Sequence, residues 1–409
     1  MPVLSPELQW LKSLVQKYYR ENTVVPAYDV SKREFGYGTF KKIDARHASF
    51  ETHHELNAFL RNQSPLFISA SVSEFSSPGM QPIQNKGLVG SDLIYEFDAD
   101  DVPTSCKQIH DSWFCVSCGM QGKGRVLKCT QCAKGTRVSE WVCSVCLDAT
   151  KKQTLALSKI LQDDFGFSEN ELHVNFSGSK GYHVHVRSPS IFSLPKSARI
   201  ELMDYLSLHE FDLGSSGFSF DGKQYYCPSF ASAQGHPKRV LAELVRLIEV
   251  GTESEWMLAS GSSPRTIKSF LGNRLGWYKE VLSGILPALP GKKTEIFWNS
   301  VLASIVEELR SRLDRQTSGD IYKLIRVPDT IHGSTGFLAK SLSWSQLPGF
   351  DPFSDAIAFS KVSERKLYVH ASPLIRIGEQ TLDPLLEQEV SVPGSLAAYL
   401  VGWGAAELR

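Results

Sequence analysis

The chain of 409 residues lacks long apolar runs, an excess of either charge, and any internal repeat or low-complexity tract. No stretch approaches the roughly 18 uninterrupted apolar residues of a membrane span. The start, MPVLSPELQW, lacks the basic and then apolar profile of a signal peptide. With 42% hydrophobic and 22% charged residues, these absences exclude collagen, coiled-coil, disordered and membrane classes. They predict a globular, soluble protein of the cytoplasm.

Charge and cysteine content narrow the function further. The 44 basic residues balance the 44 acidic ones, whereas nucleic-acid enzymes usually carry a basic excess, so any nucleic-acid footprint here must be local. Seven of the eight cysteines lie between Cys106 and Cys146. Such a cluster of CxxC pairs predicts metal binding rather than disulfides. The remaining Cys227 is predicted to be a packed core thiol.

The cysteine cluster contains enough ligands for two zinc ions. Two CxxC pairs separated by ten residues predict one tetrahedral site, made by Cys115, Cys118, Cys129 and Cys132. Four flanking ligands can close a second site of Cys3His type, made by Cys106, His110, Cys143 and Cys146. A pairing that mixes the CxxC units remains an alternative at this point. Four protein ligands leave no open position, so both sites are predicted to be structural.

Two further patterns describe the organisation of the chain. Ser5 followed by Pro6 and Glu7 predicts a helix start, and Leu8, Leu11, Val15 and Tyr18 then repeat at helical spacing. From about Leu194 to Leu313 the pattern is mainly helical, with Pro, Gly and Ser breaks. This region is predicted to be a helical subdomain.

An acidic strand follows Leu93. In LIYEFDADD, apolar and acidic residues alternate, which predicts a strand with Glu96, Asp98 and Asp100 on one face. Carboxylates two apart on a strand point the same way and can chelate a pair of divalent cations, for which oxygen ligands favour Mg²⁺ or Mn²⁺. An acidic face alone is more often simply solvated.

Two later elements offer partners to that strand. The loop from Ser177 to Gly181 lies between two predicted strands and presents hydroxyls, approachable backbone amides and Lys180, all suited to a polyphosphate. A second element joins Arg326 to the turn IHGSTG, which contains His332, and Asp320 begins the run DIYKLIR that leads into it.

The order of acidic strand, cysteine cluster, SGSKGYHVH and DIYKLIRVPDTIHGSTG resembles the catalytic small subunit of archaeal and eukaryotic DNA primase. REFGYGTF, RHASF and FDPFSDAIAF also resemble segments of that family, so the resemblance covers nearly the whole chain. It implies an α/β (α+β) catalytic fold of mixed β-sheets with helices, carrying an inserted zinc-binding module and a helical subdomain. The predicted parts are a catalytic core of residues 1–101, 147–193 and 314–375, a zinc module of residues 102–146, a helical subdomain of residues 194–313 and a C-terminal segment of residues 376–409.

The resemblance also assigns the carboxylates. The family's paired aspartates fall on Glu96 and Asp98, and its third carboxylate falls on Asp320. Glutamate at position 96 departs from the family pattern and leaves the metal spacing, or the choice between Mg²⁺ and Mn²⁺, open. Asp98 and Asp100 form an alternative pair, and Asp314 is a poorer alternative to Asp320.

Further site residues follow from the same resemblance. The nucleotide and its phosphates are expected to be bound, neutralised and oriented by Ser177, Ser179, Lys180, His183, Arg326 and His332. The family often has lysine where this chain has Ser334. Glu34 and Arg46 match elements near the incoming nucleotide, although a structural salt bridge explains them equally well. The outer zinc ligands resemble the family's single zinc site, which makes the inner four an additional knuckle.

The implied activity is that of a DNA primase, a nucleotidyltransferase and DNA-directed RNA polymerase that makes short RNA, or also DNA, primers on single-stranded DNA from nucleoside triphosphates with two Mg²⁺ or Mn²⁺ ions. The expected partners are a large primase subunit in a heterodimer, the template, the RNA primer and replisome components at the nucleoid, with no membrane. Two alternatives are a primase-like polymerase of repair or plasmid replication, and a non-catalytic zinc protein that binds nucleic acid.

Overall fold

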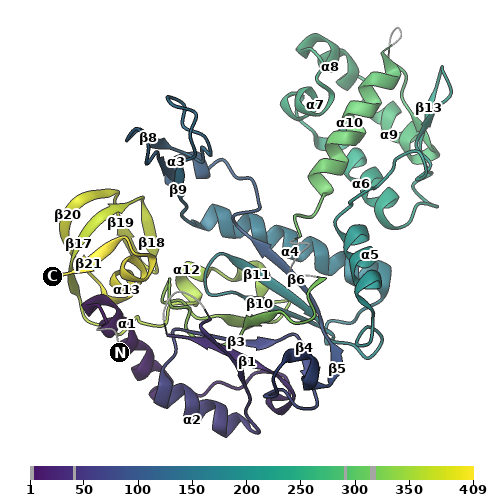
Figure 1. Ribbon diagram of the computed structural model, residues 1–409. Coiled ribbons are helices and arrows are strands. Elements are labelled where there is room, and N and C mark those ends of the chain that lie inside the picture. The colour runs from purple at the N-terminus through teal and green to yellow at the C-terminus, as the bar shows by residue number, and fades with distance from the viewer. Residues whose placement is uncertain (1–3, 40–42, 290–292, 314–318) are drawn as a thin grey trace. The chain divides into compact units, whose positions relative to one another are not determined.

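The computed structural model describes residues 4–39, 43–289, 293–313 and 319–409, so Asp314 lies outside the described residues. The chain divides into two compact units, which we treat separately (Figure 1). The core unit comprises Met1–Ser158, Phe167–Ile200 and Leu313–Arg409, and the helical unit comprises Lys159–Gly166 and Glu201–Arg312. No helix among the described residues is long and apolar enough to cross a membrane.

Two four-stranded sheets form the centre of the core unit. The first has the order β15-β3-β1-β2, with β1 at Phe35–Gly38, β2 at Ala45–Ala48, β3 at Phe67–Ser71 and β15 at Leu324–Arg326. The second has the order β16-β10-β11-β6, with β6 at Leu93–Asp98, β10 at Leu172–Phe176, β11 at Gly181–Val186 and β16 at Lys340–Leu342. Every pairing among the described strands is antiparallel, so the chain adopts the α+β form of the expected fold.

The helices of the core unit bury apolar faces next to these sheets. Helix α1 (Pro6–Glu21) starts where the sequence predicts, because the Ser5 side chain accepts the N–H of Leu8 and Pro6 takes the first helical position. It contacts α2 (His53–Gln63), and Val15 and Leu60 are part of the core. The other helices that lie wholly in the core unit are α3 (Lys107–His110), α12 (Pro352–Asp355) and α13 (Gly394–Trp403), whereas α4 (Ser144–Phe165) and α5 (Lys196–Leu206) begin in the core unit and end in the helical unit. Three short 3-10 helices span Val30–Lys32, Ile83–Lys86 and Leu347–Gly349.

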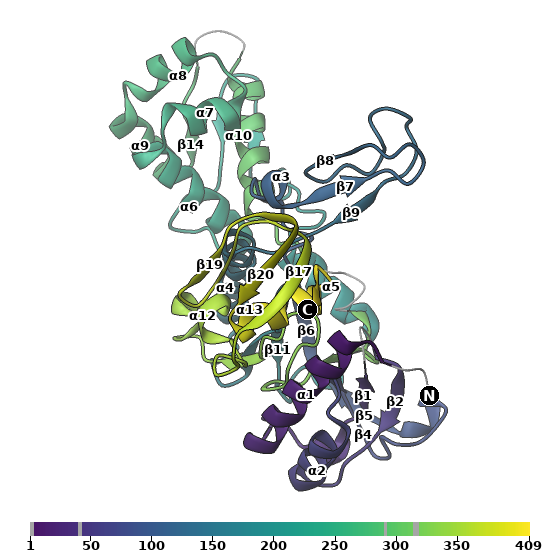
Figure 2. The same ribbon diagram turned by 90° about the vertical axis from the view of Figure 1, so that its left-hand side faces the viewer.

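Smaller sheets complete the core unit. The C-terminal sheet has the order β20-β17-β21, and α13 packs against two of its strands (Figure 2). Its strands are β17 (Arg365–Ser372), β20 (Leu385–Val392) and β21 (Ala406–Leu408), beside the hairpin of β18 (Ile375–Ile377) and β19 (Gln380–Leu382). The cysteine-rich segment forms β7 (Ser112–Phe114), β8 (Gln121–Lys123) and β9 (Arg137–Ser139), and a further pair joins β4 (Ser73–Phe75) to β5 (Leu88–Ser91).

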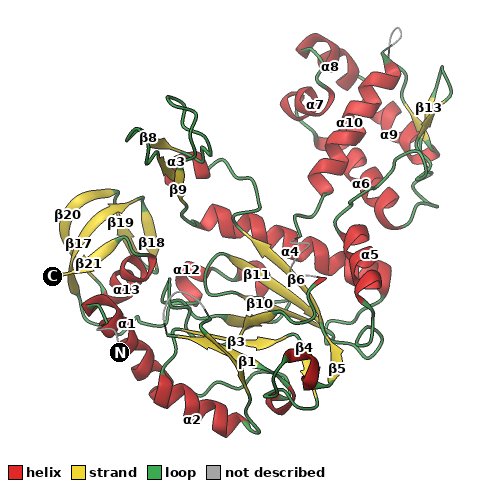
Figure 3. Ribbon diagram, in the orientation of Figure 1, coloured by secondary structure: helices red, strands yellow, loops and turns green. Residues whose placement is uncertain are grey.

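The helical unit contains the helices that the sequence predicts for this region (Figure 3). They are α6 (Gly235–Val250), α7 (Glu253–Ser260), α8 (Pro264–Leu271), α9 (Arg274–Ser283) and α10 (Thr294–Leu309), packed around the fully buried Trp256 and Trp298. A small sheet of β12 (Ser219–Phe220), β13 (Tyr225–Tyr226) and β14 (Ile285–Leu286) was not predicted, because two-residue strands have no readable period. Cys227 is buried here, as predicted, and burial raises the pKa of its thiol to about 12.

The pairing of β6 with β11 corrects one expectation about the acidic strand. Asp98 pairs with Gly181 and Glu96 pairs with His183, but the strand ends at Asp98. There the backbone N–H of Asp101 donates to the Asp98 carbonyl at 3.1 Å, so the chain turns. Asp100 therefore lies in a turn and does not continue the acidic face of the strand.

We predict that Gly181→Ala destabilises the core unit. A Cβ at this position would lie 1.8 Å from the backbone oxygen of Phe97, so β6 and β11 would have to separate locally. The free energy of unfolding, measured by chemical denaturation, is expected to fall by at least about 2 kcal/mol. Gly349→Ala is the matched control, because a Cβ there has no neighbour within 4 Å. Equal stability of the two variants would contradict the prediction.

Candidate active site

A cavity of about 590 Å³ opens in the core unit where the second sheet meets the turn that follows β15. Its walls come from β3, β6, the loop between β10 and β11, β15, the cysteine-rich segment and the end of α13. The lining residues are Ser69, Glu96, Asp98, Ser139, Glu140, Ser177, Ser179, Lys180, His183, Leu324, Ile325, Arg326, His332, Ser334, Gly402 and Trp403. The structure thus brings together two of the three expected carboxylates and all six expected nucleotide-binding residues.

Glu96 and Asp98 lie side by side at the end of β6. The Oε1 atom of Glu96 is 3.4 Å from Nε2 of His183, and its Oε2 atom is 3.6 Å from Nζ of Lys323. Burial, followed by the negative charges of Glu96 and Asp100, raises the pKa of Asp98 to about 7. Because crowded carboxylates gain from a shared cation, this pair fits a divalent metal of the Mg²⁺ or Mn²⁺ type.

Asp320 and Asp100 have other partners than this pair. Asp320 is exposed in the turn before β15, where its Oδ1 accepts the N–H of Tyr322 at 2.9 Å. The carboxylates of Glu96, Asp98 and Asp320 do not form a group within 4.8 Å in the part of the chain that the structure describes. Asp100 instead pairs with Lys180, Oδ2 to Nζ at 2.5 Å.

The loop between β10 and β11 is shaped by its own serine and by the later turn. Ser177 Oγ accepts the N–H groups of Ser179 at 3.3 Å and of Gly181 at 3.2 Å. Gly178 has a φ of 81°, a conformation that favours glycine, and its carbonyl accepts the hydroxyl of Thr335 at 2.5 Å. The two elements that the sequence presents separately are therefore joined by a direct hydrogen bond.

Lys180 reaches the cavity with two acidic neighbours. Besides Asp100, its Nζ lies 3.6 Å from Oε2 of Glu140, a residue of the cysteine-rich segment that also pairs with Arg125 at 3.2 Å. No local pattern pointed to Glu140, because the contact joins positions forty residues apart. An arriving phosphate would compete with these carboxylates for the lysine.

Arg326 and the two histidines have different charge states. Burial lowers the pKa of His183, and burial together with Arg326 and Lys180 lowers the pKa of His332 well below its usual value. Burial lowers the pKa of Arg326 to about 10, which still leaves it protonated at neutral pH. Its guanidinium lies 4.9 Å from the ring centre of Phe67. The two histidines are therefore neutral at pH 7, whereas Lys180 and Arg326 carry positive charge in the cavity.

Glu34 and Arg46 form an ion pair, Oε1 to Nε at 3.0 Å, and Glu34 is fully buried. Glu34 also faces His47 and Lys86, and Arg46 donates to the Tyr322 carbonyl at 3.2 Å. Among the described residues, neither member of the pair lines the cavity. The geometry supports a structural role next to β15.

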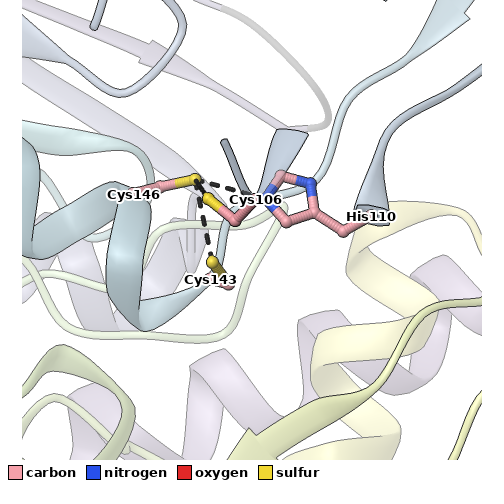
Figure 4. A group of neighbouring side chains, drawn as sticks. All are labelled: Cys106, His110, Cys143 and Cys146. Atoms are coloured by element: carbon pink, nitrogen blue, oxygen red, sulfur yellow. Dashed lines mark hydrogen bonds between the residues drawn. The ribbon is translucent and has the colours of Figure 1, made fainter. Parts of the chain in front are cut away.

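The cysteine-rich segment forms two separate ligand groups. The outer group is Cys106, His110, Cys143 and Cys146, and the inner group is Cys115, Cys118, Cys129 and Cys132 (Figure 4 shows the outer group). Within each group the ligand atoms lie within 4.8 Å of one another. Neighbouring sulfur atoms lie 3.4 and 3.8 Å apart in the outer group and 3.5 and 3.6 Å apart in the inner group. Tetrahedral zinc with Zn–S bonds of about 2.3 Å requires about 3.8 Å, so both groups fit zinc, and the nested pairing is the one that the fold forms.

Asp111 supports the outer group. Its Oδ1 atom lies 2.7 Å from Nδ1 of His110, which leaves Nε2 of that ring, 3.3 Å from Cys146 Sγ, to face the metal position. The same oxygen accepts the backbone N–H of Trp141 at 3.0 Å. Asp111 was not singled out in the sequence, although a carboxylate next to a histidine ligand is a usable signal.

Paired carboxylates opposite a loop that carries serine and lysine are the features expected of a metal-dependent enzyme that transfers nucleotidyl groups. The chain belongs to the DNA primase small subunit family, whose model matches residues 135–344, just over half of the chain. It is 28% identical to the DNA primase small subunit PriS of Methanococcoides burtonii, over 97% of each chain. It is 26% identical to that of Methanosarcina acetivorans, over 98% of this chain and 96% of the relative, and 26% identical to that of Thermoplasma volcanium, over 97% and 96%.

We predict two zinc ions per chain, separable by paired substitutions. Cys115→Ser with Cys132→Ser removes ligands of the inner group only, so elemental analysis should find one zinc. Cys132→Ser with Cys146→Ser affects both groups and should leave none. Loss of both ions from the first variant would indicate that the CxxC units are mixed.

We also predict that Asp111→Asn weakens zinc binding at the outer group. An amide cannot hold the His110 ring as a carboxylate does, and loss of such a partner typically costs about 10- to 100-fold in metal affinity. Competition with a chromophoric chelator measures this change. Asp148→Asn is the control, because Asp148 is exposed and pairs only with Lys151 among the ion pairs of the described chain.

Proposed function

We propose that this chain is a primase catalytic subunit that extends primers on single-stranded DNA by two-metal nucleotidyl transfer in the cavity described above. One observation carries the proposal. The pairing of β6 with β11 places Glu96 and Asp98 in the same cavity as the loop of Ser177, Ser179 and Lys180. Carboxylates for cations and a cradle for phosphates are the two requirements of this reaction.

Glu96 and Asp98 would hold the divalent cations, and we assign Asp320 as the third carboxylate. Bound Mg²⁺ or Mn²⁺ would lower the pKa of the primer 3′-hydroxyl and offset the charge of the leaving pyrophosphate. Asp320 lies three residues before Lys323, which contacts Glu96 at 3.6 Å, so the chain runs close to the pair at this point. Asp100 keeps Lys180 positioned until phosphate arrives.

The phosphate cradle is provided by the chain itself. Lys180 and Arg326 neutralise the triphosphate, Ser177 and Ser179 present hydroxyl and amide groups, and the neutral His183 and His332 orient its oxygens. We assign Glu34 and Arg46 an indirect role near the sugar of the incoming nucleotide. Arg46 donates a hydrogen bond to the Tyr322 carbonyl, so the pair supports the segment that leads into β15.

The same proposal covers the setting of the reaction. We propose the catalytic core, zinc module, helical subdomain and C-terminal segment with the boundaries predicted above. The substrates are nucleoside triphosphates, a DNA template and an RNA primer, and the partners are a large primase subunit and other replisome components at the nucleoid. The match over 97–98% of the chain to relatives named as primase small subunits favours this function over a repair or plasmid polymerase.

We predict that Asp98→Asn abolishes primer synthesis without unfolding the protein. Removing one metal-facing charge is expected to lower the rate on the order of 10²–10³-fold, as losses of electrostatic stabilisation do. The assay follows nucleotide incorporation on single-stranded DNA with Mg²⁺ and, separately, with Mn²⁺. Asp383→Asn is the control, because Asp383 is exposed and does not line the cavity. Wild-type synthesis by a folded Asp98→Asn protein with normal zinc content would overturn the assignment.

A further inference from the structure

The cavity has one aromatic wall that the proposed chemistry does not use. Trp403 is the last residue of α13, is only half-buried, and lines the cavity together with Gly402. Gly404, with a φ of 80°, ends the helix immediately afterwards. The remaining lining residues are mostly charged or hydroxyl-bearing. The large π face of Trp403 among them is suited to a ligand with a flat apolar surface.

Backbone contact fixes Trp403 next to the phosphate-binding turn. A Cβ on Gly402 would lie 2.8 Å from the backbone oxygen of Ser334 and 3.0 Å from that of Gly333. Only glycine permits this approach, so the last turn of α13 rests directly on the turn that begins with His332. The backbone that carries Trp403 is therefore positioned by main-chain contact.

Two other rings hold the indole in a defined plane. Trp403 stacks on Trp141 at 5.4 Å and 14°, and on Tyr399 at 5.5 Å and 24°. Both supporting rings are buried, with exposures of 7% and 1%. Trp141 is in turn anchored to Asp111, the residue that holds the zinc ligand His110.

The supporting rings leave a face of Trp403 uncovered. Two rings on opposite faces of a third are at least about 7 Å apart, twice the van der Waals contact distance of about 3.5 Å. The centres of Trp141 and Tyr399 are 6.4 Å apart, so these rings do not sandwich Trp403. Trp403 lines the cavity and is only half-buried, which agrees with a face that is open to a ligand.

We propose that Trp403 is a stacking platform for a nucleobase, supported by Trp141 and Tyr399. This inference rests on the proposed function and adds the group that recognises a base beside the groups that bind phosphate. Stacking accepts every base, because each has a π face, and so suits an enzyme that copies any template. The base belongs either to the incoming nucleotide or to a nucleic-acid strand.

Two pairs of probes distinguish these sources in the full-length, zinc-loaded protein. The first pair is ATP and inorganic tripolyphosphate, and the second is a thymidine oligonucleotide and an abasic strand of the same length. Affinities are measured for wild type, Trp403→Ala, Trp403→Phe and the control Trp10→Ala, which alters a partly buried tryptophan of α1 outside the cavity lining.

The expected result is a loss of about 10-fold or more for Trp403→Ala with the base-bearing probe of at least one pair, without loss for its base-free counterpart. The pair that responds identifies the source of the base. Trp403→Phe, which keeps a π face, should retain most of the affinity, and Trp10→Ala should match wild type. If Trp403→Ala does not fold, as judged by its melting temperature, Trp403→Leu takes its place.

Two results would overturn the inference. One is unchanged affinity for all four probes in the folded variant, and the other is an equal loss for base-bearing and base-free probes, which would indicate a distorted cavity. Primer synthesis by the wild type is measured alongside. Absence of that synthesis would contradict the proposed function, whereas normal synthesis with base-independent binding would contradict only the role of Trp403.

Discussion

The antiparallel pairing of β6 with β11 is the constraint on which the rest of the site depends. Its register sets Glu96 opposite His183 and leaves Asp98 opposite Gly181, a position with no room for a side chain. The same strand β11 continues from the phosphate loop and pairs on its other edge with β10. One ladder of hydrogen bonds thus fixes where Glu96 and Asp98 lie relative to the loop from Ser177 to Lys180, which leads directly into β11.

The cysteine-rich segment contributes to this site and is more than a local cross-link. The two residues that follow β9 contact different partners. Glu140 forms an ion pair with Lys180, and the Trp141 ring packs against Trp403 and Tyr399. The outer zinc group holds both through Asp111, which bonds His110 and the Trp141 backbone. A zinc ion held there by four protein ligands could not act on substrate directly, but it would hold the segment that supplies two walls of the cavity.

Local patterns in the sequence predicted the acidic strand, the first helix, the helical character of the second unit and the CxxC pairs, because each depends on residues a few positions apart. The combination of these pairs into two ligand sets was left open by the spacing and is shown by the fold. The resemblance to a family supplied the residues of the phosphate cradle, and their roles remain proposals. Neither Glu140 nor Trp403 was predicted as a site residue, because their contacts join distant parts of the chain. Such contacts leave no periodicity or spacing in the sequence. Asp100 lies in the turn after the predicted strand, because alternation continues in the letters after the strand has ended. The lowered pKa values of His183 and His332 depend on burial that only the fold reveals.

The cavity is lined by segments that run from Ser69 to Trp403 along the chain. Contacts between such distant positions form slowly in folding, because each requires the closure of a long loop, whereas helices and hairpins form from near neighbours. A refolding chain would therefore regain most of its secondary structure before it regains the ability to hold a nucleotide. The ability to catalyse therefore depends on the whole core unit and is acquired only at the end of its folding.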